Sequence, residues 1–170
     1  MRRAVLVVLA AAIGAGAAWA AAVAARKPSV YQDGLYGFSI QAPAFPMAPP
    51  GAIVIPVMMT APAEDKFAAN VNVVVQQVTL SRDGFRQLSL AQFKQAGFKV
   101  NVDRDLTVFG KPAILWDYEG SAVGRDLHWL ALAVIDTDRV FLVTCTALKD
   151  AFPKYEQKFH TCVNSFKPGP

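Results

Sequence analysis

Residues 113–147, AILWDYEGSAVGRDLHWLALAVIDTDRVFLVTCTA, decide the fold of this 170-residue chain. The stretch holds three runs of strand-forming residues, separated by turns at Gly124 and at residues 136–138, DTD. Apolar and polar residues alternate in the first run, which is typical of a strand with one covered face. The middle run, Arg125–Ile135, becomes apolar on both faces, as expected of a central strand covered on both sides. The short turns predict an antiparallel meander.

A fourth strand of the meander is predicted directly before this stretch. Phe98–Phe109 alternates, and strict alternation puts Val100, Val102 and Val108 on one face. The turn at residues 110–112, GKP, joins this run to the next.

Further strands are predicted nearer the N-terminus. Asn70–Leu80, NVNVVVQQVTL, alternates valine with polar residues. Pro56 interrupts Ile53–Met59, so that run is expected at a sheet edge. The expected strands are, in order, Tyr36–Gln41, Ile53–Met59, Asn70–Leu80, Phe98–Phe109, Ala113–Val123, Arg125–Ile135 and Arg139–Ala147.

Two helices complete the predicted architecture. A short helix is expected to begin at a capping box formed by Ser89 and Gln92 and to end at Gly97. A long C-terminal helix is expected from about Asp150, because the apolar residues that follow recur three and four positions apart. These are Phe152, Tyr155, Phe159, Cys162, Val163 and Phe166.

The fold class that follows is α+β. An antiparallel sheet of about six to seven strands would be covered by the short helix and the long helix, giving an α/β/α sandwich. The expected organisation is a single domain over residues 36–167, preceded by a linker at residues 26–35.

The N-terminus predicts export. Arg2 and Arg3 are followed by 22 uncharged residues, 4–25, with small residues at A-x-A-like positions near the end of the run. Residues 1–25 are therefore interpreted as a signal peptide, with an uncleaved anchor helix as the alternative, since about 20 residues span a bilayer. The expected location is periplasmic or secreted, and membrane contact is expected only if the segment is retained.

Composition excludes some classes of function. The formal net charge is +4, and removing the leader with its two arginines leaves 15 − 13 = +2, which does not resemble the basic surface of a nucleic-acid binder. Zinc needs three or four protein ligands, and besides the cysteines the chain offers only His128 and His160. No metal site and no cofactor are expected.

The two cysteines, Cys145 and Cys162, lie in the last predicted strand and the last predicted helix. Because the helix folds back on the sheet and an exported domain meets oxidising conditions, a disulfide between them is expected. Two buried free thiols are the alternative.

Several short motifs lie within and between the predicted elements. They are residues 36–40 (YGFSI) with Pro43, residues 110–113 (GKPA), and residues 139–144 (RVFLVT) with Phe159, Ser165 and Phe166. These motifs resemble the PsbP-like superfamily, which includes small exported bacterial proteins, and the match covers most of residues 36–166. The resemblance implies an α/β/α fold and a role as a binding or assembly accessory, with no family active site to transfer.

The proline-rich segment Ala42–Gly51 is the expected binding loop. It carries the apolar residues Phe45 and Met47 on a backbone stiffened by four prolines. The alternative is that both side chains fold back and cap the core. The partner, a protein or a small ligand, is not specified by the sequence.

A polar cluster is expected on the central strands, formed by Asp117, Glu119, Arg125 and His128. Cross-strand ion pairs are its expected role. The alternative function is a small exported hydrolase in which His128 acts with Asp117 or Glu119. None of the candidate serines lies in a G-x-S-x-G nucleophile motif, so the primary expectation is a binding protein that is not an enzyme.

Overall fold

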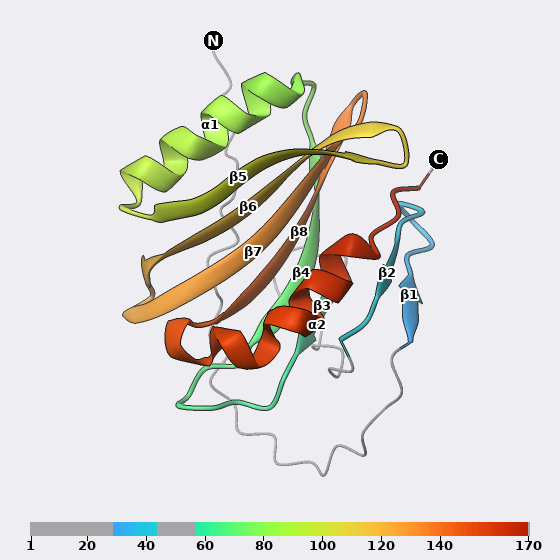
Figure 1. Cartoon of the computed structure of the whole chain (residues 1–170). Coiled ribbons are helices and arrows are strands. Elements are labelled where there is room, and N and C mark those ends of the chain that lie inside the picture. Colours follow the sequence, from blue (N-terminus) through green and yellow to red (C-terminus); the bar gives the residue numbers. More distant parts are fainter. Residues whose placement is uncertain (1–28, 44–56, 170) are drawn as a thin grey trace.

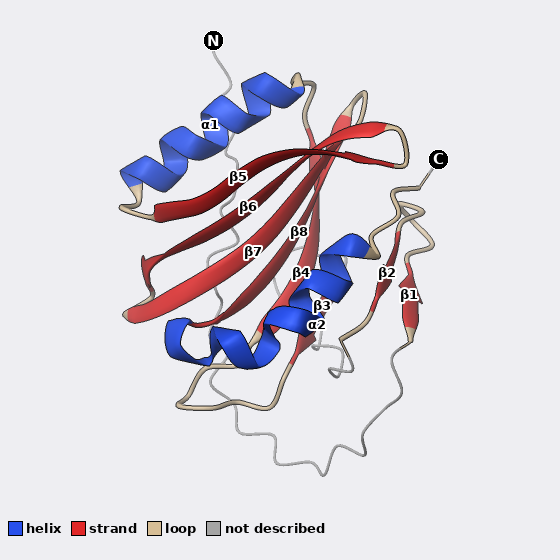
Figure 2. Cartoon of the chain, in the orientation of Figure 1, coloured by secondary structure: helices blue, strands red, loops and turns tan. Residues whose placement is uncertain are grey.

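A six-stranded antiparallel sheet forms the centre of the computed structural model, which describes residues 29–43 and 57–169 (Figure 1). The strand order is β3-β4-β8-β7-β6-β5, and a separate small sheet pairs β1 with β2 (Figure 2). The expected signal or anchor segment and the loop residues Phe45 and Met47 lie outside the described residues. The strands are β1 Val30–Gln32, β2 Ser39–Gln41, β3 Val57–Thr60, β4 Asn70–Gln77, β5 Lys99–Val108, β6 Lys111–Ala122, β7 Arg125–Ile135 and β8 Arg139–Leu148.

The predicted meander is confirmed, because β5, β6, β7 and β8 are consecutive neighbours joined by short turns. β4 then pairs with the far side of β8, which makes β7 and β8 central. Both are buried on their two faces over most of their length, as the apolar character of Arg125–Ile135 predicts.

One face of the sheet is covered by the C-terminal helix α2, Phe152–Asn164, which follows the 3-10 turn η1, Lys149–Ala151. The helix packs on β7 and β8, and the small β1–β2 sheet lies beside it (Figure 1). Phe159, Cys162 and Phe166 are almost fully buried in this layer. The predicted stripe of apolar residues is therefore the contact surface of the helix.

The other face carries the helix α1, Arg82–Gln95, which packs chiefly on β5 and β6. Trp116 and Tyr118 point to this side, where Phe93 stacks on Tyr118 with ring centroids 4.3 Å apart. Two core layers, one on each side of the sheet, make the α/β/α sandwich that the sequence predicts.

The start of α1 was predicted wrongly. The helix begins at Arg82 rather than at Ser89, and Ser81 is its cap, accepting a hydrogen bond from the Gly84 backbone N–H at 3.1 Å. Ser89 instead lies inside the helix and is buried against the sheet. The physical reason is that Phe85, Ser89 and Phe93 form one stripe at spacings of four.

The single apolar face predicted for β5 is also wrong. The register between β5 and β6 shifts between Val100 and Val102, which is a β-bulge. The extra residue reverses the alternation, so Val100 packs on the α1 side and Val108 on the α2 side. Val102 is left exposed.

A short strand lies within the expected linker. β1 pairs with β2 in antiparallel register, with Tyr31 opposite Ile40. Beside this pair, Asp33 begins a tight turn by accepting hydrogen bonds from the backbone N–H groups of Leu35 and Tyr36 at 3.0 and 2.6 Å.

Candidate functional site

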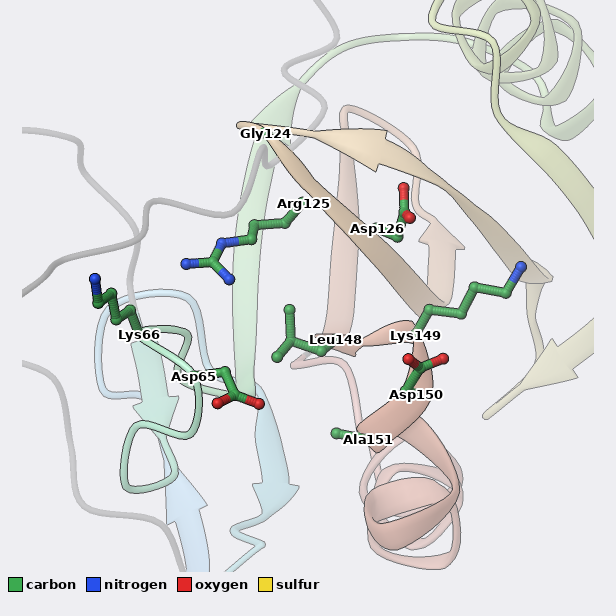
Figure 3. Close-up of a pocket in the computed structure, with 9 residues that line it drawn as sticks. All are labelled: Asp65, Lys66, Gly124, Arg125, Asp126, Leu148, Lys149, Asp150 and Ala151. Atoms are coloured by element: carbon green, nitrogen blue, oxygen red, sulfur yellow. The ribbon is translucent and has the colours of Figure 1, made fainter.

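A groove of about 820 Å³ lies at one end of the sheet (Figure 3). Three separate segments meet there: the loop between β3 and β4, the turn between β6 and β7, and the junction from β8 into α2. Its lining residues are Asp65, Lys66, Gly124, Arg125, Asp126, Leu148, Lys149, Asp150 and Ala151.

The loop on one side of the groove is a tight hairpin. Glu64 and Phe67 exchange backbone hydrogen bonds of 2.8 and 2.9 Å, which leaves Asp65 and Lys66 as the two turn residues. Glu64 is tied to α2 by an ion pair with Lys154, and the hydroxyl of Tyr155 donates to the same carboxylate at 3.4 Å. The Lys154 hydrogen bond lowers the pKa of Glu64. The hairpin is thereby held against the helix that borders the groove.

Backbone strain gathers at this end of the sheet. Asp65 and Lys66 have φ values of 48° and 62°, and Val123, at the turn that lines the groove, has a φ of 50°. Residues other than glycine rarely adopt this left-handed region, and a β-branched residue does so at a cost. Val123 is also 61% exposed. Two of the four described non-glycine residues with positive φ therefore line the groove, and a third, Val123, directly precedes the lining residue Gly124. Such strain is typical of functional sites.

Most charged groups that line the groove have no ion-pair partner. Among the residues that the structure describes, no ion pair is formed by Asp65, Lys66, Arg125 or Asp150. Arg125 extends between the two walls, toward the hairpin (Figure 3). The groove thus presents free charges of both signs, whereas ten ion pairs occupy other charged residues of the described chain.

The expected polar cluster divides into three parts. The Asp117 carboxylate accepts hydrogen bonds from His128 Nε2 at 2.8 Å and from Asn101 Nδ2 at 2.9 Å. Glu119 forms ion pairs with Lys99 and Lys149, both at 3.1 Å, and the hydrogen bond with Lys149 is the main cause of its lowered pKa.

The third part of the cluster is Arg125, which lies in the groove. Sequence reasoning selected this residue for a possible ion pair, and the structure places it beside unpaired charges instead. The other groove residues were not predicted as a site.

The hydrolase alternative needs a hydroxyl beside His128, and the described residues do not supply one. The ring of His128 stacks on Phe152 with centroids 3.6 Å apart, and its Nε2 is bound to Asp117. The nearest candidate by sequence, Ser121, donates its hydroxyl hydrogen bond to Asp126. The arrangement orients His128 but lacks the nucleophile that an acyl-transfer site requires.

Cys145 and Cys162 come together in the layer between β8 and α2 but remain free thiols in the structure. Burial raises the pKa of Cys145 well above its ordinary value, and the hydrogen bond with Cys162 adds to the shift. The predicted proximity is present, while the predicted disulfide is not formed in this structure and stays a prediction.

A row of buried polar groups escaped the sequence reasoning. Asn72, Gln76 and Thr146 each have a buried side-chain atom without a hydrogen-bond partner among the described residues. Asn72 pairs with Thr144 in the β4–β8 register, and Asn70 pairs with Thr146. The alternation of valine with polar residues in Asn70–Leu80 predicts two different faces of the strand, and the structure buries Asn70 and Asn72 on the polar one.

The described residues contain no group of three His, Cys, Asp or Glu side chains placed to hold a metal ion. Neither helix in residues 29–43 and 57–169 has the length and apolar character that a membrane crossing needs.

Solved structures identify the fold. The solution structure of cyanobacterial PsbP (CyanoP) from Synechocystis sp. PCC 6803 superimposes with a TM-score of 0.60 at 16% identity, covering 87% of this chain and 96% of that one. The fold is PsbP-like. LpqN of Mycobacterium tuberculosis, involved in cell envelope biogenesis, matches with a TM-score of 0.60 at 15% identity, covering 85% of this chain and 91% of LpqN.

A third PsbP-like structure is PA94 of Pseudomonas aeruginosa, a protein of unknown function. It matches with a TM-score of 0.57 at 17% identity and covers 85% of this chain and 99% of that one. No family model matches the sequence. These identities establish the PsbP-like fold and nothing finer.

One curated relative is similar in sequence. Effector EagT6 of Pseudomonas aeruginosa PAO1 is 28% identical over 85 residues, which is 50% of this chain. The matched stretch spans 59% of that protein.

Proposed function

We propose that this chain is an extracytoplasmic binding or assembly-accessory protein without catalytic activity, and that the groove at the end of the sheet receives its partner. The structural relatives support an accessory role, since LpqN is involved in cell envelope biogenesis. The leader-like N-terminus supports the location.

The observation that carries the proposal is the set of unpaired charges around the groove. Arg125 and Asp150 line the same groove without an ion pair among the described residues, and so do Asp65 and Lys66. Charges of both signs on separate walls favour a partner with complementary charges and reject partners with like charges. A surface segment of another protein fits this description best, because a protein segment carries both signs at the spacing of a groove.

The backbone supports the same surface. Val123 is held in a strained conformation with most of its side chain in solvent. An apolar side chain kept at a cost next to Gly124, which lines the polar groove, fits a contact that is made only when the partner is bound.

A photo-crosslinking experiment tests the proposal. The amino acid p-benzoylphenylalanine replaces Leu148, inside the groove, or Gln157, on an exposed part of α2, in the full-length chain expressed in its host cells. We expect one dominant crosslinked protein from position 148 and none of it from position 157. The charge reversal Arg125→Glu should reduce the crosslink at least about 10-fold, which corresponds to about 1.4 kcal/mol of binding free energy.

Two results would contradict the proposal. One is equal crosslinking from both positions, which would make the contact non-specific. The other is a groove crosslink that Arg125→Glu leaves unchanged while the variant is folded.

The second candidate function, a small exported hydrolase, is favoured by one observation, the 2.8 Å contact between Asp117 and His128 Nε2. Its test is hydrolysis of p-nitrophenyl acetate by the wild type and by His128→Ala. Turnover that is abolished by His128→Ala would support the hydrolase, and equal background rates would exclude its use of this histidine.

A further inference from the structure

The thiols of Cys145 and Cys162 are the buried reactive groups that the proposed function leaves unused. Cys145 is 0% exposed and Cys162 is 1% exposed, and both belong to the core layer between the sheet and α2. Cys145 lies in central strand β8, between Val71 of β4 and Leu130 of β7. Since α2 packs on β8 and Cys145 shares its core layer with Cys162 of that helix, the docked helix helps to shield the Cys145 thiol from solvent.

Cys162 also contacts the small sheet. Its thiol donates to the carbonyl oxygen of Gln41 at 3.2 Å, and the hydroxyl of Ser165 accepts from the Gln41 backbone N–H at 2.8 Å. The same hydroxyl donates to the Cys162 carbonyl at 2.7 Å. Gln41, at the end of β2, is thus fastened to the C-terminal part of α2 through both of its backbone polar groups.

We infer that Cys145 and Cys162 form an intramolecular disulfide, and that it closes while α2 is still undocked from the sheet rather than in the folded chain. The inference rests on the exported location proposed above. The two thiols are brought together by the docking of α2 on β8, yet in the docked state both are buried and out of reach of the bulky oxidant that the reaction requires. A sulfur must be reached by the oxidant before its partner thiol can complete the exchange.

The reaction is an ordinary two-step exchange. A thiolate of one cysteine attacks a sulfur of the oxidant's disulfide, forms a mixed disulfide and releases one thiol. The thiolate of the other cysteine then attacks the protein-side sulfur of the mixed disulfide and releases the second thiol. The chain loses two protons and two electrons, and the oxidant's disulfide is reduced to two thiols. In an oxidising compartment the oxidant would be a disulfide-bonded oxidoreductase.

Burial also opposes the reaction after folding. The raised pKa of Cys145 leaves its nucleophilic thiolate almost unpopulated at neutral pH. Closing the bond removes the S–H donor that Cys162 offers to Gln41, while the bond from Ser165 remains. The oxidised chain therefore keeps the small sheet attached through the Ser165 hydrogen bond and through the backbone bridge between Ser39 and Lys167.

The test compares two oxidation regimes on the full-length chain, purified and kept reduced. In the first, the chain refolds from guanidinium chloride in the presence of oxidised glutathione. In the second, the folded chain meets the same oxidant in native buffer. After each time point the sample is unfolded, treated with N-ethylmaleimide and weighed by intact mass spectrometry.

We expect refolded chains without labelled thiols or bound glutathione, and oxidation of the folded chain at least about 100-fold slower, as for a core that opens rarely. Two labelled thiols after refolding, or stable glutathione adducts, would overturn the pairing. Equal rates of oxidation during refolding and in the folded chain would contradict the proposal that the disulfide closes before α2 docks. Neither outcome touches the groove, so failure here is distinct from failure of the proposed function.

Matched variants identify the bond. Cys145→Ser leaves Cys162 with its contact to Gln41, and Cys162→Ser replaces that thiol by a hydroxyl that can donate to the same carbonyl. Each variant should take up one glutathione when unfolded and form no internal bond. If a variant fails to fold, the thiol count of the refolded wild type still decides the question.

Discussion

Asp117 of β6 and His128 of β7 are joined diagonally across the sheet. The residue opposite His128 in the register is Glu119, yet Nε2 of the ring lies 2.8 Å from the Asp117 carboxylate. Phe152, at the start of α2, stacks on the imidazole with the planes inclined by only 11°. Because Glu119 pairs with two lysines, the histidine turns toward the carboxylate that remains.

This geometry predicts that the pair stabilises the fold. Asp117→Asn should lower the free energy of unfolding by about 1 kcal/mol, since it removes the charged acceptor of one part-buried and one exposed hydrogen bond. His128→Ala should cost about 1–2 kcal/mol, because the stacking on Phe152 is lost as well. Urea unfolding measures both values, with Glu156→Gln on the exposed side of α2 as a control expected to change little. Unchanged stability in both variants would show that the pair of Asp117 and His128 does not stabilise the fold.

The strained turn predicts a gain in stability. Val123→Asn should raise the free energy of unfolding by about 1 kcal/mol, because asparagine tolerates positive φ far better than a β-branched residue does. The same change should weaken the partner crosslink from the groove. Urea unfolding and the crosslinking experiment provide the two readouts.

Phe109→Asn is the matched control for the turn. Phe109 has a φ of 49° and precedes Gly110 as Val123 precedes Gly124, but it lies at the other end of β6. It should gain stability by a similar amount and leave the crosslink unchanged. Loss of crosslinking in both variants would mean that the effect does not come from the groove.

The meander from β5 to β8 could be predicted from the sequence because its strands are long and consecutive. The alternation in residues 113–122 indicates a strand with one covered face, and the apolar run in Arg125–Ile135 indicates a strand covered on both faces. The turns between these strands are so short that consecutive strands must pair in antiparallel order. The start of α1 was harder, because Ser89 occupies a buried position between Phe85 and Phe93 and resembles a cap. The spacing of four residues was the signal that marks the longer helix.

The groove could not be predicted from local pattern. Its walls come from residues 65–66, 124–126 and 148–151, which meet only after the sheet has formed. The Asp65-Lys66 turn also lacks the glycine or asparagine that usually marks a two-residue hairpin. The bulge in β5 could not be predicted either, because it is defined by the pairing of β5 with β6. One extra residue changes that pairing but leaves the composition of the strand unchanged.

The ion pair between Lys111 and Asp136 predicts a specific dependence of stability on pH. The two side chains lie 2.8 Å apart, and the hydrogen bond from Lys111 is the main cause of the lowered pKa of Asp136. The folded chain therefore binds fewer protons at this site than the unfolded chain, whose Asp pKa is about 4. Its stabilisation is complete above that value and is lost as the pH falls through the lowered pKa.

Lys111→Gln should weaken the dependence of the free energy of unfolding on pH in the range where Asp136 titrates. The variant should be less stable than the wild type at about pH 6, and the difference should shrink as the pH falls below about 4. Urea unfolding from about pH 3 to pH 6 measures it. A difference that is constant over the range would show that the effect of the substitution does not come from the Asp136 carboxylate.

At Thr146, removing a polar group should not lower the free energy of unfolding, in contrast to the removal of the bonded groups at Asp117 and Lys111. Thr146 is fully buried, and its Oγ1 has no hydrogen-bond partner among the described residues. Thr146→Val keeps the shape and should leave stability unchanged or raise it by about 1 kcal/mol. Thr161→Val is the contrast, because that hydroxyl donates to the Gln157 carbonyl at 2.9 Å. A loss above about 1 kcal/mol for Thr146→Val would show that the hydroxyl is satisfied in solution.

The disulfide predicts the largest change in stability. A bond between Cys145 and Cys162 encloses residues 146–161, and closing a loop of about 15 residues stabilises the folded state by about 3 kcal/mol in the chain-entropy model. The oxidised chain should therefore unfold at higher urea concentration than the chain in reducing buffer. The slope of the transition should fall slightly, because the bonded unfolded chain exposes less surface.

Cys145→Ser provides the control for this comparison. The variant cannot form the bond, so its unfolding midpoint should be the same in oxidising and reducing buffer. A wild type whose midpoint is equal or lower when oxidised would show that the bond strains the contact between α2 and β8 as much as it restricts the unfolded chain. Since Cys145 and Cys162 lie in the same core layer and their thiols interact there, the bond would join elements that are already neighbours, and the gain estimated above is expected.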